Sequence, residues 1–402
     1  MNKFWQQLAI ATNWPVLLAV ALLSCLGIVT IWADTRFDPQ PEWQKQIVFL
    51  IVATLCMALF QAVDYRQIGR FATAFYVASL LLVLYTVVGG FAESHGHPLP
   101  FVHSTKGAHN WINFGPASLQ PAELMKIAFV MVLARYLRFR SNYRTLRGLL
   151  PPFALALVPI AFILKQPDLG TALIFIPALF VMLFVAGAKI RHLALIVMMG
   201  SALCPIAWWA GTDERGQPHS TIPLMRYLPE MIKTYQRQRV YAMFSNDQRT
   251  LAGTGFQQQH ALIAYGSGGL VGKGIGKLTV GRSVPEGHND MIYALIGEQL
   301  GFFGSALVLG AYLVLFVAGV EIAAATREPF GKLLAVGVIA LLSGQTFLNL
   351  LVAVKLMPVT GVTLPFISSG GSSLVASFMA AGLLLNIGQH RPLVMANDAF
   401  EY

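Results

Sequence analysis

The sequence predicts an all-α integral membrane protein with about ten transmembrane helices and a large extracytoplasmic loop between the seventh and eighth helices. Of its 402 residues, 56% are hydrophobic and only 11% are charged, whereas soluble domains carry about 25% charged residues. Apolar runs long enough to cross about 30 Å of hydrocarbon recur along the whole chain. Because one soluble core cannot absorb so many runs, we expect them to lie in lipid.

Charges, prolines and glycines separate the apolar runs, and these breaks define the predicted spans. The spans are 14–33, 45–63, 70–92, 119–136, 148–164, 169–187, 191–210, 296–320, 329–351 and 366–388. The first run follows only Lys3 and exceeds a typical signal-peptide core, so we expect it to be retained. The chain is expected to form one polytopic membrane domain, with helices 1–7 in 1–210, the extracytoplasmic loop in 211–290, and helices 8–10 with a cytoplasmic tail in 291–402.

The positions of lysine and arginine predict that both termini are cytoplasmic, because cytoplasmic loops are enriched in these residues. With the N-terminus inside, the short inner segments hold Lys3, Arg66, Arg70, Arg135, Arg138, Arg140, Arg144, Arg147, Lys189, Arg191, Arg327, Lys332 and Arg391. The net charge of +10 is therefore mostly a topology signal, and we expect no nucleic-acid partner. The long loop carries nine basic against six acidic residues, which fits either an anionic lipid headgroup or a solvated loop with scattered ion pairs.

Glu123 and Lys126 are charged residues inside a predicted span. They follow Pro121, whose place in the first turn indicates a helix start, and a spacing of three puts both on one helix face. Lys126 would lie about 10 Å below the outer boundary, where a lone charge costs at least about 2.5 kcal/mol. The two residues must face protein or water, either as a self-neutralising structural pair or, as we favour, as part of a functional site.

Two outer turns and a glycine-rich stretch have competing interpretations. Asp168 in KQPDLGTA is placed to cap the next helix. The small residues of PVTGVTLPFISSGGSS at 358–373 favour close helix packing, and backbone N–H groups at that helix start could also hold an anion. YGSGGLVGKGIGK at 265–277 is not a P-loop, because the pattern fails at Ser267 and Gly274. With Lys273 it remains compatible with a pyrophosphate held by backbone dipoles.

Asp290 ends the segment VPEGHND, where extended backbone is expected to become the eighth helix. A carboxylate at this position can cap the helix. It can also act as a general base, since burial raises a carboxyl pKa and neighbouring cations lower it. Spacing alone leaves both roles open, and we include the neighbouring Glu286 and His288 among the candidate substrate-binding residues.

Six motifs in order resemble the shape, elongation, division and sporulation (SEDS) family, the RodA and FtsW proteins. They are KGAHNWINFGPASLQPAELMK, QPDLGTAL, YQRQR, YGSGGLVGKG, VPEGHNDMIYALIGEQLGFFG and LMPVTGVTLPFISSGGSS. The resemblance covers nearly the whole chain. It implies a peptidoglycan glycosyltransferase that joins lipid II units on the outer face of the bacterial inner membrane and releases undecaprenyl pyrophosphate.

The resemblance also implies roles for particular residues. The family's HTD aspartate falls on Asp290, as the base that deprotonates the acceptor sugar hydroxyl. The QPSE motif and its following lysine fall on Glu123 and Lys126, and a loop tryptophan falls on Trp111. Pyrophosphate binding would draw on Lys126, Arg239 and Lys273, whose charge would also stabilise the leaving group.

The resemblance implies a class B penicillin-binding protein as transpeptidase partner. A divalent cation, magnesium or manganese, is a candidate cofactor, although no compact ligand motif indicates one. The sequence departs from the family at Asn110, His260, Ser369 and Lys355, which leaves open which cations hold pyrophosphate. The short N-terminus and YQRQR favour the RodA branch over the division branch.

Two other functions compete with glycosyl transfer. A lipid II translocase would use the same intramembrane pair without bond chemistry, but no inverted repeat is apparent and the polar residues gather near the outer face. A non-catalytic scaffold for a transpeptidase would have no need of Asp290. Both alternatives predict that the purified chain makes no glycan.

Overall fold

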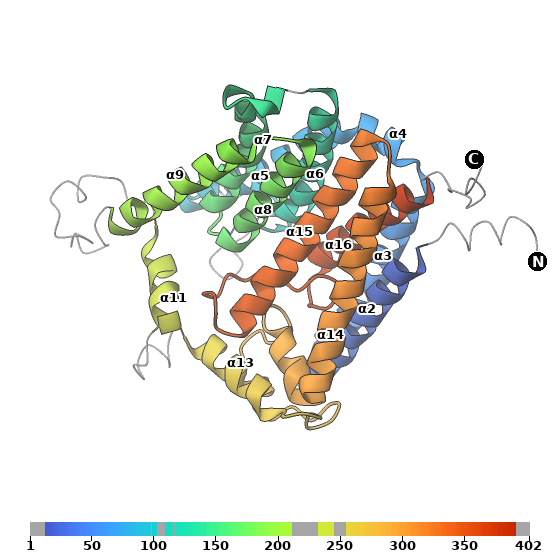
Figure 1. Ribbon diagram of the computed structural model, residues 1–402. Helices are drawn as coiled ribbons and strands as arrows, with labels where there is room; N and C mark the ends of the chain where they lie inside the picture. The colour runs from blue at the N-terminus through green and yellow to red at the C-terminus, as the bar shows by residue number, and fades with distance from the viewer. Residues whose placement is uncertain are drawn as a thin grey trace, which may run out of the picture.

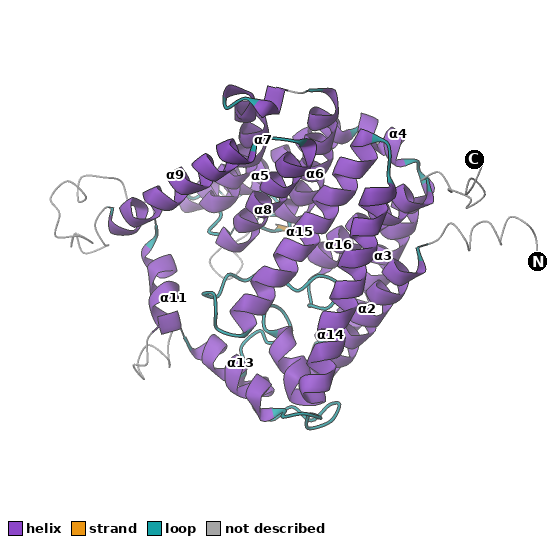
Figure 2. Ribbon diagram, viewed as in Figure 1, coloured by secondary structure: helices purple, strands orange, loops and turns teal. Residues whose placement is uncertain are grey.

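The computed structural model describes residues 13–97, 99–102, 109–115, 117–140, 142–210, 232–244 and 255–390. Long helices pack side by side, and short loops connect most of them (Figures 1 and 2). The helices are α2 (Trp14–Thr35), α3 (Glu42–Ala62), α4 (Tyr65–Arg70), α5 (Ala72–Ser94), α6 (Pro121–Phe139), α7 (Leu150–Lys165), α8 (Leu169–Ala186), α9 (Ile190–Trp209), α11 (Thr234–Phe244), α13 (Phe256–Ser267), α14 (Ile292–Ala325), α15 (Pro329–Ala353) and α16 (Gly371–Gln389). Two short strands, β1 (Ile112–Asn113) and β2 (Ser118–Leu119), form an antiparallel pair.

The prediction of an all-α membrane protein is confirmed. Within the described ranges, nine helices are long and apolar enough to cross a membrane. The nineteen-residue α6 corresponds to the fourth predicted span, 119–136, and it falls outside this group because it carries Glu123, Lys126, Arg135 and Arg138. The count of ten is therefore approximate. It includes α6, whose charged side chains need partners on neighbouring helices.

The helix α16 forms the centre of the bundle, where 89% of its most apolar stretch is buried, against 6% for α9. Small residues allow this close packing. A Cβ added to Gly382 of α16 would lie 2.7 Å from the carbonyl oxygen of Met57 on α3. At the end of the bundle near α4, the buried Asn386 amide donates to the carbonyl of Phe60, 2.7 Å away, and its oxygen accepts from Tyr65 N–H at 3.0 Å. This side chain satisfies the backbone where α3 ends and α4 begins.

Two helices differ most from the predicted spans. α14 runs over 292–325 instead of 296–320, and Gly301 interrupts it with φ 64° and ψ −156°. α16 begins at 371 instead of 366, because Phe366 (φ 67°) and Gly370 (φ 159°) have non-helical backbone. Hydropathy detects the apolar residues on both sides of such breaks, but it does not detect the breaks.

The glycine-rich segment 265–277 packs against the kinked start of α14. A Cβ on Gly268 would lie 1.9 Å from the carbonyl oxygen of Gly297. The N–H groups of Lys273 and Gly274 donate to the carbonyls of Glu298 and Gln299, each at 2.9 Å. The sequence was compatible with pyrophosphate binding by backbone N–H groups of this segment. In the structure, these two N–H groups instead donate to carbonyls of α14.

The substitution Gly268→Ala tests this packing. The added methyl group would meet backbone that cannot move aside, so we expect a loss of about 1–3 kcal/mol of stability, seen as a lower melting temperature in detergent. Gly266→Ala is the matched control, because a Cβ at Gly266 of α13 meets nothing within 4 Å and alanine favours helix. Equal melting temperatures for the two variants would contradict the proposed backbone contact.

Candidate active site

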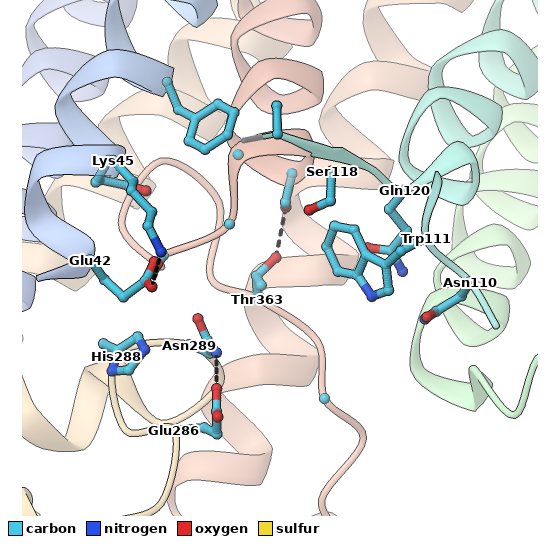
Figure 3. Close-up of a pocket in the computed structure, with 18 of the residues that line it drawn as sticks. Glu42, Lys45, Asn110, Trp111, Ser118, Gln120, Glu286, His288, Asn289 and Thr363 are labelled. Carbon is cyan, nitrogen blue, oxygen red and sulfur yellow. Dashed lines mark hydrogen bonds and ion pairs between the residues drawn. The ribbon is translucent and has the colours of Figure 1, made fainter. Parts of the chain in front are cut away.

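A pocket of about 820 Å³ opens at one end of the bundle, where the loops that follow α2, α5, α7 and α15 meet. Its lining residues come from 38–49, 110–120, 167–168, 286–289 and 360–373, together with Arg239 of α11. In Figure 3, the labelled side chains from 42–45, 110–120 and 286–289, together with Thr363, face a common space. All of the segments lie at the end of the helices opposite to α4.

The paired strands β1 and β2 form one wall of the pocket. Trp111 and Asn110 line the pocket just before β1. Ser372 at the start of α16 anchors the other strand, because its hydroxyl accepts from Gln120 N–H at 3.0 Å and donates to the Ser118 carbonyl at 3.1 Å. The wall is therefore fixed to the same helix start that the small-residue motif 358–373 provides.

The lining residues of segment 360–373 are called the floor of the pocket here. Two buried amides of α15 support it. Gln345 Nε2 donates to the Thr363 carbonyl at 3.0 Å. Asn349 Nδ2 donates to the carbonyls of Val362 at 2.7 Å and of Asp290 at 2.8 Å. Asn349 thus ties the floor segment to the segment that carries Asp290, which lies 59 residues earlier in the chain.

Glu123 and Lys126 form the ion pair that their spacing predicted, with Lys126 Nζ 2.9 Å from Glu123 Oε2. Both are buried, at 5% and 2% exposure. Lys126 Nζ also donates to Gln345 Oε1 at 2.7 Å. Neither residue lines the pocket, so the pair lies behind the floor and contacts it through Gln345.

Asp290 is buried, at 7% exposure, and is not itself among the lining residues, but it directly follows the lining residues Glu286, His288 and Asn289 in the chain. Its Oδ1 accepts from Gln257 Nε2 of α13 at 2.8 Å. The N-cap of α14 is Met291, and no side chain caps this helix, so the capping role considered for Asp290 is not observed. The pKa of Asp290 is raised to about 6, mainly by burial and also by the Glu286 carboxylate, while a backbone hydrogen bond, the Gln257 amide and the charge of Arg239 oppose the rise.

Besides Trp111, three predicted site residues line the pocket: Arg239, Glu286 and His288. Arg239 Nη1 donates to the Val359 carbonyl at 2.9 Å. Glu286 has φ 54° and accepts from the Asn289 amide, a bond that Figure 3 also shows. His288 Nδ1 lies 2.9 Å from Asp34 Oδ2 at the end of α2.

Lys273 lies elsewhere. Its Nζ is 2.6 Å from Oε1 of the fully buried Glu298, which also accepts from the backbone N–H groups of Thr279, Val280 and Gly281. This cluster fastens the glycine-rich segment to α14, and Lys273 is not among the residues that line the pocket.

Asp168 has the capping role predicted for it. Its Oδ1 accepts from Thr171 N–H at 3.0 Å, and its Oδ2 accepts from the Gln120 amide at 2.9 Å. Burial raises the pKa of Asp168 despite the hydrogen bonds from Thr171, which lower it. Of the departures from the family pattern, Asn110 and Ser369 line the pocket, whereas His260 and Lys355 do not.

Sequence reasoning missed Asp34, Gln257, Gln345 and Asn349, each of which positions a site residue. A signal existed for two of them, because Gln345 and Asn349 are amides spaced four residues apart inside an apolar span. Among the described residues, no three His, Cys, Asp or Glu side chains are grouped closely enough to hold a metal.

Taken together, the site offers the carboxylate of Asp290, which can accept a proton, next to a large cavity with polar lining residues.

Comparisons with known proteins agree with the predicted family. The family model described as "Cell cycle protein", which spans FtsW, RodA and SpoVE, matches residues 7–392. The chain is 32% identical over 387 residues to a probable peptidoglycan glycosyltransferase FtsW of Geobacter metallireducens, with 92% of this chain and 93% of the relative covered. It is 29% identical over 397 residues to peptidoglycan glycosyltransferase MrdB of Escherichia coli, with 98% and 97% covered.

Solved structures show the same fold. A chain from a study titled "Structural coordination of polymerization and crosslinking by a peptidoglycan synthase complex" aligns with a TM-score of 0.75 at 29% identity, over 94% of this chain and 98% of that one. The rod shape determining protein RodA of Thermus thermophilus aligns with a TM-score of 0.62 at 27% identity, over 94% and 97%. This chain is therefore a bacterial membrane protein that belongs to the SEDS family of RodA, FtsW and SpoVE proteins.

Proposed function

We propose that this chain polymerises lipid II in the pocket, with Asp290 as the general base. As a member of a family whose relatives are named peptidoglycan glycosyltransferases, the chain is an enzyme of this class. The observation that carries the site assignment is the buried carboxylate of Asp290, whose pKa burial raises to about 6, beside a polar cavity of about 820 Å³. A base poised near the working pH is efficient in proton transfer.

In the proposed reaction, Asp290 removes the proton from a sugar hydroxyl of the acceptor. The oxygen then forms a bond to the anomeric carbon of the donor, and the bond from that carbon to the diphosphate oxygen breaks. Undecaprenyl diphosphate leaves as an anion. Trp111 offers an apolar face for a sugar ring, and Arg239 offers a cation for the phosphates.

Glu123 and Lys126 support this proposal indirectly. They were predicted to bind substrate, and Lys126 reaches the floor of the pocket only through Gln345. We assign the pair to positioning: it holds Gln345, which holds Thr363, whose hydroxyl lies 2.6 Å from Ser373 Oγ at the start of α16. Lys273 would act even further from substrate, through the Glu298 cluster.

The alternatives make different demands. A translocase must carry a headgroup across the bilayer, yet the residues that line the pocket all come from one end of the helices. A scaffold would not require a carboxylate whose pKa burial raises. The naming of relatives as glycosyltransferases favours the enzyme, and the choice between elongation and division stays a prediction.

We further propose that the pocket faces the outside of the bacterial inner membrane, with both termini in the cytoplasm. The lysine and arginine bias supports this orientation. A class B penicillin-binding protein is the proposed partner, supported by the similarity to a chain of a peptidoglycan synthase complex. Magnesium or manganese would need phosphate oxygens of the substrate to complete its ligand set, and a chelator in the polymerisation assay tests for it.

Asp290→Asn tests the chemistry. Asparagine keeps the size of the side chain but cannot accept the proton, so lipid II polymerisation by the purified protein should fall about 10²–10⁴-fold while lipid II binding persists. For the wild type, kcat/KM should fall below pH about 6, where Asp290 becomes protonated. Glu286→Gln should move this limb to lower pH, because the Glu286 carboxylate raises the pKa of Asp290. An Asn variant that polymerises at the wild-type rate would sink the assignment.

Changes at Glu123 and Lys126 test the positioning pair. Each single variant, Glu123→Gln or Lys126→Gln, leaves a buried charge unpaired, which costs about 3–5 kcal/mol. The double variant removes both charges and should lose less stability than the sum of the two single changes, as measured by melting temperature in detergent. Polymerisation should recover in parallel. Strictly additive losses would show that the two side chains act independently.

Cysteine labelling tests the orientation. In a background without Cys25, Cys56 and Cys204, Leu270→Cys should react with a membrane-impermeant thiol reagent applied to intact spheroplasts. Leu146→Cys should react only after permeabilisation. Both positions are exposed, at 66% and 48%, so accessibility alone does not separate them, and the reverse pattern would overturn the proposed direction of the pocket.

A further inference from the structure

The described residues that line the pocket include few cations for a substrate that carries a diphosphate. Four carboxylic acids line it, namely Asp38, Glu42, Asp168 and Glu286. Among the described residues of the lining, the permanent cations are Lys45 and Arg239. Lys45 Nζ lies 2.8 Å from Glu42 Oε1, so this carboxylate competes with a phosphate for the ammonium group.

The other expected cations lie outside the lining. Lys126 is 2% exposed and paired with Glu123, and Lys273 is paired with Glu298. Release of a diphosphate nevertheless requires positive charge or hydrogen-bond donors where the anion develops. A further hydrogen-bond donor in the lining would add to this stabilisation.

His288 has the required geometry. Its Nδ1 is bonded to Asp34 Oδ2 at 2.9 Å, and Asp34 does not line the pocket. Within the described part of the chain, Nε2 of His288 has no hydrogen-bond partner, and it is not among the buried polar atoms that lack one. The ring therefore presents its Nε2 edge to the cavity that it lines.

The partner at Nδ1 decides what Nε2 can do. With Asp34 ionised, Nδ1 carries the proton of this hydrogen bond, so Nε2 can donate only in the imidazolium form. Burial lowers the pKa of His288, but the hydrogen bond to Asp34 and the charges of Asp34, Glu286 and Glu42 outweigh burial, and the net shift is upward. The carboxylates around the ring thus favour the imidazolium.

We propose that His288, held by Asp34, binds the diphosphate of the lipid donor and donates Nε2–H to the departing phosphate oxygen. Asp34 is a positioning residue: it orients the ring and keeps it charged without touching substrate. His288 stabilises the anion that forms when the anomeric carbon–oxygen bond breaks, while Asp290, two residues later, accepts the acceptor proton. The inference rests on the proposed function. It assigns a positive charge to His288 and a negative charge to Asp290, two residues apart in one turn.

The test measures product binding apart from turnover, with radiolabelled undecaprenyl diphosphate and undecaprenyl monophosphate as probes for the protein in nanodiscs. His288→Gln keeps a polar side chain but no charge, and it should weaken diphosphate binding about ten- to hundred-fold, the range for a charge-assisted hydrogen bond. Monophosphate binding should change less. His95→Gln is the matched control, because His95 is exposed and does not line the pocket.

Asp34→Asn separates charge from structure. Asparagine can still accept the hydrogen bond from Nδ1, so the ring keeps its place, but the pKa of His288 should fall. Diphosphate binding should then weaken at a lower pH than in the wild type, with near-normal binding under acidic conditions. A uniform loss at every pH would assign Asp34 a purely structural role, and His288→Gln binding as tightly as wild type would overturn the proposal.

These outcomes remain distinct from failure of the proposed function. If the wild-type chain makes no glycan but its diphosphate binding still depends on His288, the polymerase assignment fails and the binding site stands. If the chain polymerises lipid II and the His288 variant binds product normally, the polymerase assignment stands and the diphosphate site fails.

Discussion

Irregular backbone near a membrane must find its hydrogen-bond partners within the protein, and the site depends on this constraint. The segments around 286–290 and 354–370 are neither helical nor extended in a sheet. Asn349 and Gln345, both about 1% exposed, supply donors to their carbonyls from within α15. Because these amides belong to α15, a long helix packed in the bundle, they hold the non-helical segments of the site in fixed positions.

The same need for partners within the protein connects the buried pair Glu123 and Lys126 to the pocket. A buried lysine requires a counter-charge and further hydrogen bonds, which Glu123 and Gln345 provide. The same Gln345 holds the Thr363 carbonyl with its amide group. One side chain thus satisfies a buried cation with its oxygen and the pocket floor with its nitrogen. A change at Lys126 would be transmitted to the floor, although Lys126 does not line the pocket.

The features that the sequence predicted correctly are formed by residues close together in the chain. The apolar runs, the Glu123–Lys126 pair and the Asp168 cap each depend on residues only a few positions apart, and all three appear in the structure. The kink at Gly301, the Asp34–His288 bond and the placement of Lys273 beside Glu298 depend on segments that meet only in the folded chain. Glycines in 265–277 looked like a phosphate cradle because close approach to backbone and close approach to phosphate favour the same residue.

The sign of the charges in the pocket also suits a sugar substrate. Carboxylates accept hydrogen bonds from sugar hydroxyls, whereas they repel a diphosphate, so the acidic residues described in the lining would act differently on the two ends of the proposed substrate, lipid II. Arg239 and His288 in the lining would draw the diphosphate to their side. On the proposed function, this division of charge orients the donor before reaction, and the anomeric carbon then lies between a group that accepts a proton and groups that stabilise the departing anion.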